Sequence, residues 1–100
     1  LRNNSIDILC GATTKTLSRS ELVDFTQLTF ITGAALLSLK SVEIKGISDL
    51  MGKKVAVVKD TTTMDILAKT LKKEISDAKI IPVDSASAGM DLVIKGEVDA

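Results

Sequence analysis

The sequence contains no histidine, one cysteine, no tryptophan or tyrosine, and only two phenylalanines among its 100 residues. The lack of histidine excludes acid–base catalysis and metal ligation by imidazole. Because Cys10 is the single cysteine, an internal disulfide and a cysteine-cluster metal site are excluded as well. We therefore expect no metal site and no cofactor, and a core made of Ile, Leu, Val and Ala.

An excess of charge of one sign is also lacking, since 13 basic residues balance 13 acidic residues. No basic stripe indicates a nucleic-acid partner, and no acidic tail is present. The longest apolar stretch, 30–39, is interrupted by Thr32, Gly33 and Ser38. It is far shorter than the roughly 20 residues of a membrane-spanning helix. These features predict a soluble chain that does not bind nucleic acid.

The length and the two ends predict a piece of a larger protein. One hundred residues amount to one domain or to part of one. The chain begins with Leu1 and shows no signal peptide. Residues 1–4 resemble the last turn of a helix, and residues 97–100 resemble the opening of a strand.

From residue 55 onward, the apolar pattern predicts strand–helix–strand–helix–strand. Residues 55–58 form an unbroken apolar run typical of a buried strand, and Pro82 indicates that the strand at 80–83 lies at an edge or ends there. Ser85 is the expected cap of the second helix, Gly96 its end, and Val98 the start of the next strand. This order favours an α/β layer with parallel pairing and right-handed crossovers. The predicted buried helix faces are Met64, Leu67, Ala68 and Leu71, and then Ala86, Met90, Val93 and Ile94.

The first half of the chain predicts fewer elements. A strand is expected over 6–10, and a helical turn over 18–23 with Ser18 and Glu21 as a capping box. The long β-prone run 28–39 predicts a strand that passes from one domain to another. A short helix is expected over 46–51.

Several segments, taken in order, resemble a known family. These are "SIDILCGATTKTLSRSELVDFTQ", "ISDLMGKKVAVVKDTTTMDIL" and "MDLVIKGEVDA". Their order and spacing are similar to those of the family 3 extracellular solute-binding proteins, the receptors of polar amino-acid ABC importers. The glutamate/aspartate branch is the nearest one, because "CG.TT" and "DL.GK.V.V..GTT" are typical of it.

The resemblance implies a periplasmic-binding-protein-like (type II) fold, with two α/β lobes joined by crossing strands and a ligand in the cleft. Residues 1–27 would be the end of lobe one, and 28–40 the crossing strand and hinge. Residues 41–100 would be most of lobe two, truncated at its C-terminal end. The chain would therefore hold an incomplete two-lobe fold.

Arg19 is the first candidate ligand-binding residue, and two interpretations are open. It is either a solvated arginine in a polar loop or, as the resemblance implies, the group that binds the α-carboxylate of the ligand. A planar guanidinium offers two parallel donors to a carboxylate. The resemblance adds Thr13 and Thr14 beside it, and Thr26 from the pair Phe25-Thr26.

The run Thr61-Thr62-Thr63 also has two interpretations. Asp60 or Thr61 caps the following helix, or the first N–H groups of that helix bind an anion. The resemblance implies that Thr61 and Thr62 contact ligand. It also shows a departure, since Asp60 stands where the family usually has Gly. A carboxylate there would repel an anionic ligand.

The resemblance implies an amino-acid-binding component of an ABC importer, with glutamate or aspartate as the ligand, and not an enzyme. Its partners would be the amino acid and a membrane permease, and its location would be periplasmic or extracellular. Exposed strand edges also predict a homodimer. The alternatives are a ligand-sensing domain of a receptor or histidine kinase, an enzyme on this fold, and a structural fragment that binds nothing.

Overall fold

The computed structural model describes residues 1, 3–74 and 77–100, and the chain divides into two compact units. Unit 1 comprises Leu1–Gly33 and unit 2 comprises Ala34–Ala100. The boundary between the units falls within 28–40, the segment expected to be a crossing strand. The assignment of the units to two lobes remains a prediction.

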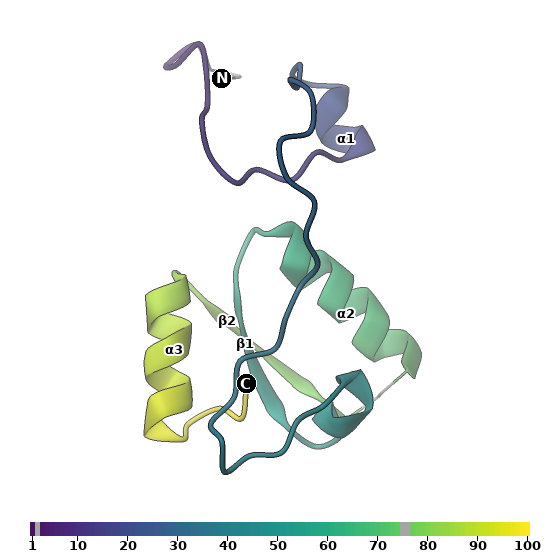
Figure 1. Ribbon diagram of the computed structural model, residues 1–100, viewed down its shortest axis with the longest axis vertical. Helices are drawn as coiled ribbons and strands as arrows, with labels where there is room; N and C mark the ends of the chain where they lie inside the picture. The colour runs from purple at the N-terminus through teal and green to yellow at the C-terminus, as the bar shows by residue number, and fades with distance from the viewer. Residues whose placement is uncertain (2, 75–76) are drawn as a thin grey trace. The chain divides into compact units, whose positions relative to one another are not determined.

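Unit 2 is built around a parallel sheet (Figure 1). Strand β1 spans Lys54–Val58 and strand β2 spans Lys79–Val83, and the two pair in register over their whole length. Helix α2, Thr62–Glu74, connects them, and helix α3, Ala86–Lys95, follows β2. The parallel pairing and the order of these elements confirm the prediction from sequence.

The last residues of the chain pair with the other edge of β1. The backbone N–H of Ala100 donates to Lys54 O at 3.3 Å, and the N–H of Ala56 donates to Ala100 O at 2.7 Å. One residue thus bonds to two residues that flank Val55, which is the hydrogen-bond pattern of a parallel ladder. The expected strand opening after Val98 is therefore present, and β1 is the middle of three paired segments.

Helices α2 and α3 cover opposite faces of this sheet (Figure 1). The chain moves from β1 to β2 in one direction and then returns past β1, so two right-handed crossovers must lie on different sides. Leu71 of α2 belongs to the core cluster with Val55 and Val57. Gly89 of α3 faces the other side of β1, because a Cβ built on it would lie 3.7 Å from the Cβ of Ala56.

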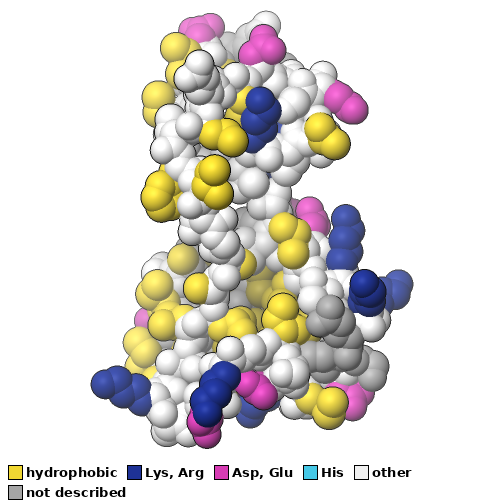
Figure 2. Space-filling model, turned by 45° about the vertical axis from the view of Figure 1, so that its right-hand side comes forward, with side chains coloured by type: hydrophobic (Ala, Val, Ile, Leu, Met, Phe, Trp, Pro, Cys, Tyr) yellow, Lys and Arg dark blue, Asp and Glu magenta, His cyan; other side chains and the backbone are white. Residues whose placement is uncertain are grey.

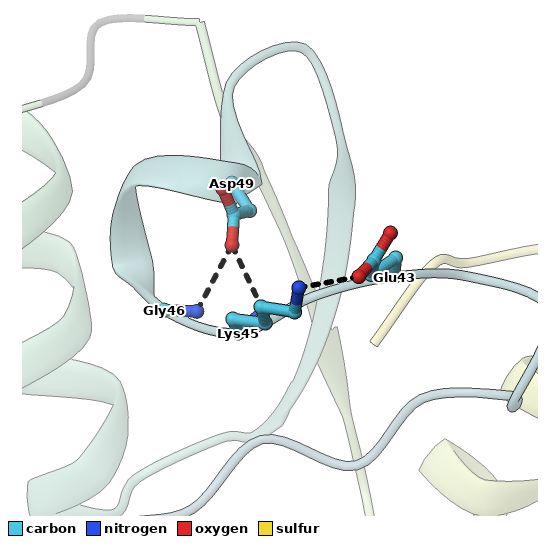
Figure 3. A network of polar contacts seen from close by, with 4 residues as sticks. All are labelled: Glu43, Lys45, Gly46 and Asp49. Atoms are coloured by element: carbon cyan, nitrogen blue, oxygen red, sulfur yellow. Dashed lines mark hydrogen bonds and ion pairs between the residues drawn. The ribbon is translucent and has the colours of Figure 1, made fainter.

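The core on the α2 side depends on a short 3-10 helix, η1, at Ile47–Leu50. Leu50 is fully buried, with 0% of its surface exposed. The Asp49 carboxylate holds this turn by accepting the backbone N–H of Lys45 at 2.8 Å and of Gly46 at 3.1 Å (Figure 3). Lys45 also forms an ion pair with Glu43. The short helix predicted over 46–51 is confirmed. The buried core cluster to which Leu50 belongs comprises Leu50, Val55, Val57, Leu71 and Ala100.

Pro82 lies on the outer edge of β2. Lys79 donates to Lys53 O and Val83 accepts from Lys59 N, so these two residues of β2 face β1. Because the hydrogen-bonding direction alternates along a strand, Pro82 faces away from β1, where its missing N–H costs no ladder bond. The prediction of an edge position is confirmed, and the proline also weakens this edge as a template for another strand.

The buried face of α3 differs from the predicted one. Val93 is buried, but Met90 is 48% exposed and Ile94 is 71% exposed, and Ala86 is exposed as well. The reason is Gly89, whose lack of a side chain lets the helix approach the sheet along the line of Gly89 and Val93. In α2, Leu71 is buried and Met64 and Leu67 are partly buried as predicted, whereas Ala68 is exposed.

Among the described residues of unit 1, which are 1 and 3–33, the one regular element is the four-residue helix α1 at Leu17–Ser20. Its cap is Thr16, and the capping box predicted for Ser18 and Glu21 is wrong. The strands predicted over 6–10 and 28–39 are also wrong, since neither segment joins a ladder among the described residues. A β-strand is stabilised by its neighbour, and β-prone side chains alone do not supply one.

Candidate functional site

The local fold of unit 1 positions Arg19. Thr16 caps α1, its hydroxyl oxygen accepting the Arg19 backbone N–H at 3.2 Å. The Arg19 side chain turns back along the chain, and its Nη1 donates to the carbonyl oxygen of Thr14 at 3.0 Å. Arg19 is partly buried, although most of its neighbours in sequence are exposed. The structure therefore brings together two of the predicted site residues, Thr14 and Arg19.

The guanidinium of Arg19 retains most of its capacity to bind a ligand. It has five N–H donors, and within the described part of the chain a single hydrogen bond, to Thr14 O, uses one of them. The same hydrogen bond restricts the side chain, so less conformational entropy remains to be lost on binding. Such a group is suited to a carboxylate, which accepts two parallel N–H bonds.

The other predicted residues of unit 1 lie in exposed segments. Thr13 and Thr14 precede α1, and both are exposed. Thr26 is exposed, and its hydroxyl donates to the carbonyl of Gln27 at 3.2 Å. A further contact in unit 1 was not predicted from the sequence: Lys15 Nζ lies over the ring of Phe25, 6.0 Å from its centroid. An aromatic residue ten positions from a lysine carries no pattern that would have indicated this pair.

In unit 2, Thr61 is the cap of α2. Its hydroxyl oxygen accepts the Met64 N–H at 3.3 Å, and its carbonyl accepts the Asp65 N–H at 3.3 Å. The Thr61 hydroxyl proton is donated to Val58 O at 2.7 Å. The two alternatives left open by the sequence, Asp60 or Thr61, are thus decided in favour of Thr61. Because its proton is already donated, this hydroxyl can offer a ligand only a lone pair.

Asp60 has a left-handed backbone conformation, with φ of 59°. Residues with a side chain rarely adopt this conformation, although Asp tolerates it better than most. Glycine adopts it without a steric penalty, which gives a physical reason for the glycine that the resemblance places at this position. In the described part of the chain, the Asp60 carboxylate has no hydrogen-bond or ion-pair partner, and the residue is exposed.

An ion pair joins the carboxyl ends of the two strands. Lys59 follows β1 and Asp84 follows β2, and their Nζ and Oδ1 atoms are 2.6 Å apart. In parallel α/β sheets this is the edge at which ligands bind, and α2 also begins there, after Thr61. This pair is not among the site residues predicted from the sequence. Opposite charges placed directly after two neighbouring parallel strands are the signal that would have found it.

The described residues contain no group of three or more metal-ligating side chains. Among the helices that are described, none is long and apolar enough to cross a membrane.

The family model described as "NMT1/THI5 like" matches residues 12–100. The chain belongs to this family. The match covers both the segment that holds Arg19 and the whole α/β sheet of unit 2.

Curated relatives of the chain are solute-binding proteins. A "Glutamate/aspartate import solute-binding protein" of Salmonella typhimurium is 36% identical over 81 residues, which are 81% of this chain and 27% of the relative. An "L-glutamate/L-aspartate-binding protein" of Pseudomonas aeruginosa is 40% identical over 67% of this chain and 22% of the relative. The corresponding import protein of Escherichia coli K12 is 32% identical over 81% of the chain and 27% of the relative.

A solved structure shows the same fold. It is "An ancestral arginine-binding protein bound to arginine", which is 31% identical and has a TM-score of 0.88 over 99% of this chain and 43% of that one. The resemblance to amino-acid solute-binding proteins, nearest the glutamate/aspartate branch, is confirmed, as is the periplasmic-binding-protein-like fold. The chain spans about a quarter of the length of the curated relatives, 22% to 27%.

Proposed function

We propose that this chain is part of the amino-acid-binding component of an ABC importer, that it acts outside the cytoplasmic membrane, and that it is not an enzyme. The observation that supports the proposal is the Arg19 guanidinium, which is held by Thr14 O and has four donors left for a carboxylate within the described residues. The similarity to proteins named for glutamate/aspartate binding points to the same class of ligand.

In unit 1, Arg19 binds the α-carboxylate of the amino acid through two parallel charge-assisted hydrogen bonds. Thr13, Thr14 and Thr26 add polar contacts around it, since all three are exposed. The carbonyl of Thr14 has a separate role, because it fixes the direction of the guanidinium.

In unit 2, Thr61 and Thr62 at the start of α2 contact another polar group of the ligand. The N-terminus of a helix carries partial positive charge and backbone N–H groups that favour an anion. The hydroxyl of Thr61 donates to Val58 O and therefore stabilises the loop. A membrane permease is the partner that would receive the amino acid.

Calorimetric titration of the complete gene product with glutamate, aspartate and arginine tests this proposal. We expect saturable binding of at least one of them at a stoichiometry of one. No binding of any amino acid would contradict the proposed function. For the 100-residue chain by itself we expect weak binding or none, because it spans about a quarter of the length of the curated relatives.

Replacing Asp60 with Gly is expected to strengthen glutamate binding. The substitution removes an exposed carboxylate beside the start of α2, and exposed charge pairs contribute about 0.2–1 kcal/mol, so the affinity should rise up to about fivefold. The free energy of unfolding should change by less than about 1 kcal/mol, because relief of the left-handed conformation offsets the added chain entropy.

The measurement is a glutamate titration of the complete gene product and its Asp60→Gly variant. Asp91→Asn is the matched control, since Asp91 is an exposed carboxylate on α3. Equal affinities in all three proteins would mean that Asp60 does not act on the ligand. The threonine run would then be explained by its role as a helix start.

We also propose that the 100-residue chain self-associates. Large apolar side chains are exposed, and Figure 2 shows hydrophobic groups on the surface. Leu28, Phe30 and Ile31 are 67%, 80% and 85% exposed. Because Pro82 weakens the outer edge of β2, the apolar segment 28–31 is the better candidate for the contact between two copies of the chain. Light scattering at high concentration should detect a dimer or larger species, and a monomer throughout would refute the proposal.

A further inference from the structure

We infer that Lys15 is a specificity-determining residue that favours amino acids with a second carboxylate and disfavours those with a cationic side chain. The inference rests on the proposed function, in which Arg19 binds the α-carboxylate.

The backbone on both sides of Lys15 is held by hydrogen bonds. The carbonyl of Thr14 accepts from the Arg19 guanidinium at 3.0 Å. The hydroxyl of Thr16 accepts from the Arg19 backbone N–H at 3.2 Å, and the carbonyl of Thr16 accepts from the Ser20 N–H. Residues 14–19 thus form the bend that positions Arg19. Lys15 lies within this bend, so its placement is coupled to that of the proposed carboxylate-binding group.

The side chain of Lys15 extends over an aromatic ring. Its Nζ is 6.0 Å from the centroid of Phe25, which is partly buried. A cation over a ring face is attracted by the negative charge of that face. The contact favours one direction for a side chain that would otherwise sample many rotamers.

The positive charges of Lys15 and Arg19 are both available to a ligand. Among the described residues, the ion pairs all lie in unit 2, at Lys45, Lys53 and Lys59, so neither Lys15 nor Arg19 is paired with a carboxylate. One cation is sufficient for the single α-carboxylate of a neutral amino acid. A second cation in the same bend has a ligand partner only when the amino acid carries a second carboxylate.

The same contact acts against basic amino acids. Aromatic faces attract guanidinium and ammonium groups of ligands. The face of Phe25 already carries the ammonium of Lys15, and a basic ligand side chain would meet a like charge there. Lys15 thus favours glutamate or aspartate over arginine by both attraction and repulsion.

The alternative is that Lys15 is a solvated surface lysine without effect on the ligand. A charge-removing variant, Lys15→Gln, and a charge-retaining one, Lys15→Arg, separate the two cases. Lys95→Gln is the matched control, because Lys95 is exposed at the end of α3. Lys15 is itself exposed, so thermal melting of all variants should match that of the parent.

Calorimetry on the complete gene product would measure glutamate and glutamine binding for each variant. We expect Lys15→Gln to weaken glutamate binding about fivefold, the upper end for an exposed charge pair, and to leave glutamine binding within about twofold. Lys15→Arg and Lys95→Gln should bind glutamate as the parent does.

Equal glutamate binding by the parent and Lys15→Gln would overturn the inference and leave the proposed function standing. A similar loss for glutamate and glutamine would also overturn it, because Lys15 would then act on the structure of the bend. A parent that binds neither glutamate, glutamine nor arginine would refute the proposed function, and this inference with it.

Discussion

The Arg19→Gln variant of the complete gene product should bind glutamate about 100-fold more weakly than the parent. Hydrogen bonds to charged groups contribute about 1.5–3 kcal/mol, and a factor of ten corresponds to about 1.4 kcal/mol. Arg19 is partly buried and its guanidinium is held by Thr14 O, so its donors are fixed in direction before the ligand binds. Loss of the charge leaves the ligand carboxylate with weaker, neutral donors. Calorimetry or equilibrium dialysis with glutamate would measure the change.

Arg19→Lys is the matched control for this experiment. It retains the positive charge but removes the planar fork of donors, so it should recover only part of the affinity. Both variants keep a side chain that can lie along the bend, and both leave the α1 cap intact, since Thr16 bonds to the backbone of residue 19. Unchanged affinity in Arg19→Gln would show that Arg19 is a solvated arginine, which is the other interpretation of the sequence.

The Leu50→Ala variant should lose about 3–5 kcal/mol in the free energy of unfolding. Leu50 is the one side chain of the described core with 0% of its surface exposed, and it packs against Val55, Val57 and Leu71. Truncation of a buried leucine removes its transfer free energy and leaves a cavity, at a combined cost of about 2–5 kcal/mol. Unit 2 comprises only Ala34–Ala100, and a domain of this size has little stability to spare.

Urea denaturation followed by circular dichroism would measure this loss. Ile47→Ala is the control within the same short helix, because Ile47 is 38% exposed and should lose about half as much or less. Similar losses for the two variants would contradict the assignment of Leu50 to the centre of the core. A variant that fails to fold would be consistent with the prediction, and Leu50→Val then gives a measurable, smaller loss.

The sheet of unit 2 could be predicted because each of its signals is local. The apolar run of β1, the helical spacing of Met64, Leu67 and Leu71 in α2, and the glycine after α3 all act within a few residues. Gly96 ends α3 in the left-handed conformation, with φ of 72°. Alternation of strands and helices then restricts the topology to parallel pairing with right-handed crossovers.

Predictions from local sequence were wrong where contacts with a distant part of the chain decide the structure. Residues 6–10 and 28–39 have β-prone side chains, yet neither joins a ladder in the described part of the chain. Helical periodicity for α3 placed Met90 and Ile94 inside, although both are exposed. The pattern contains apolar residues on two overlapping stripes, and only the close approach at Gly89 selects between them.

The candidate site also has features that the sequence predicted and features that only the tertiary structure decided. The sequence by itself indicated that the threonine run starts a helix, and the resemblance to solute-binding proteins singled out Arg19 as a carboxylate-binding residue. The tertiary structure decided that Arg19 is held by Thr14 O, that Thr61 and not Asp60 caps α2, and that Lys15 lies over Phe25. Residue type and spacing determine which interactions a chain is able to make. Which of them form depends on backbone dihedrals and on contacts between distant residues, and these exist only once the chain has folded.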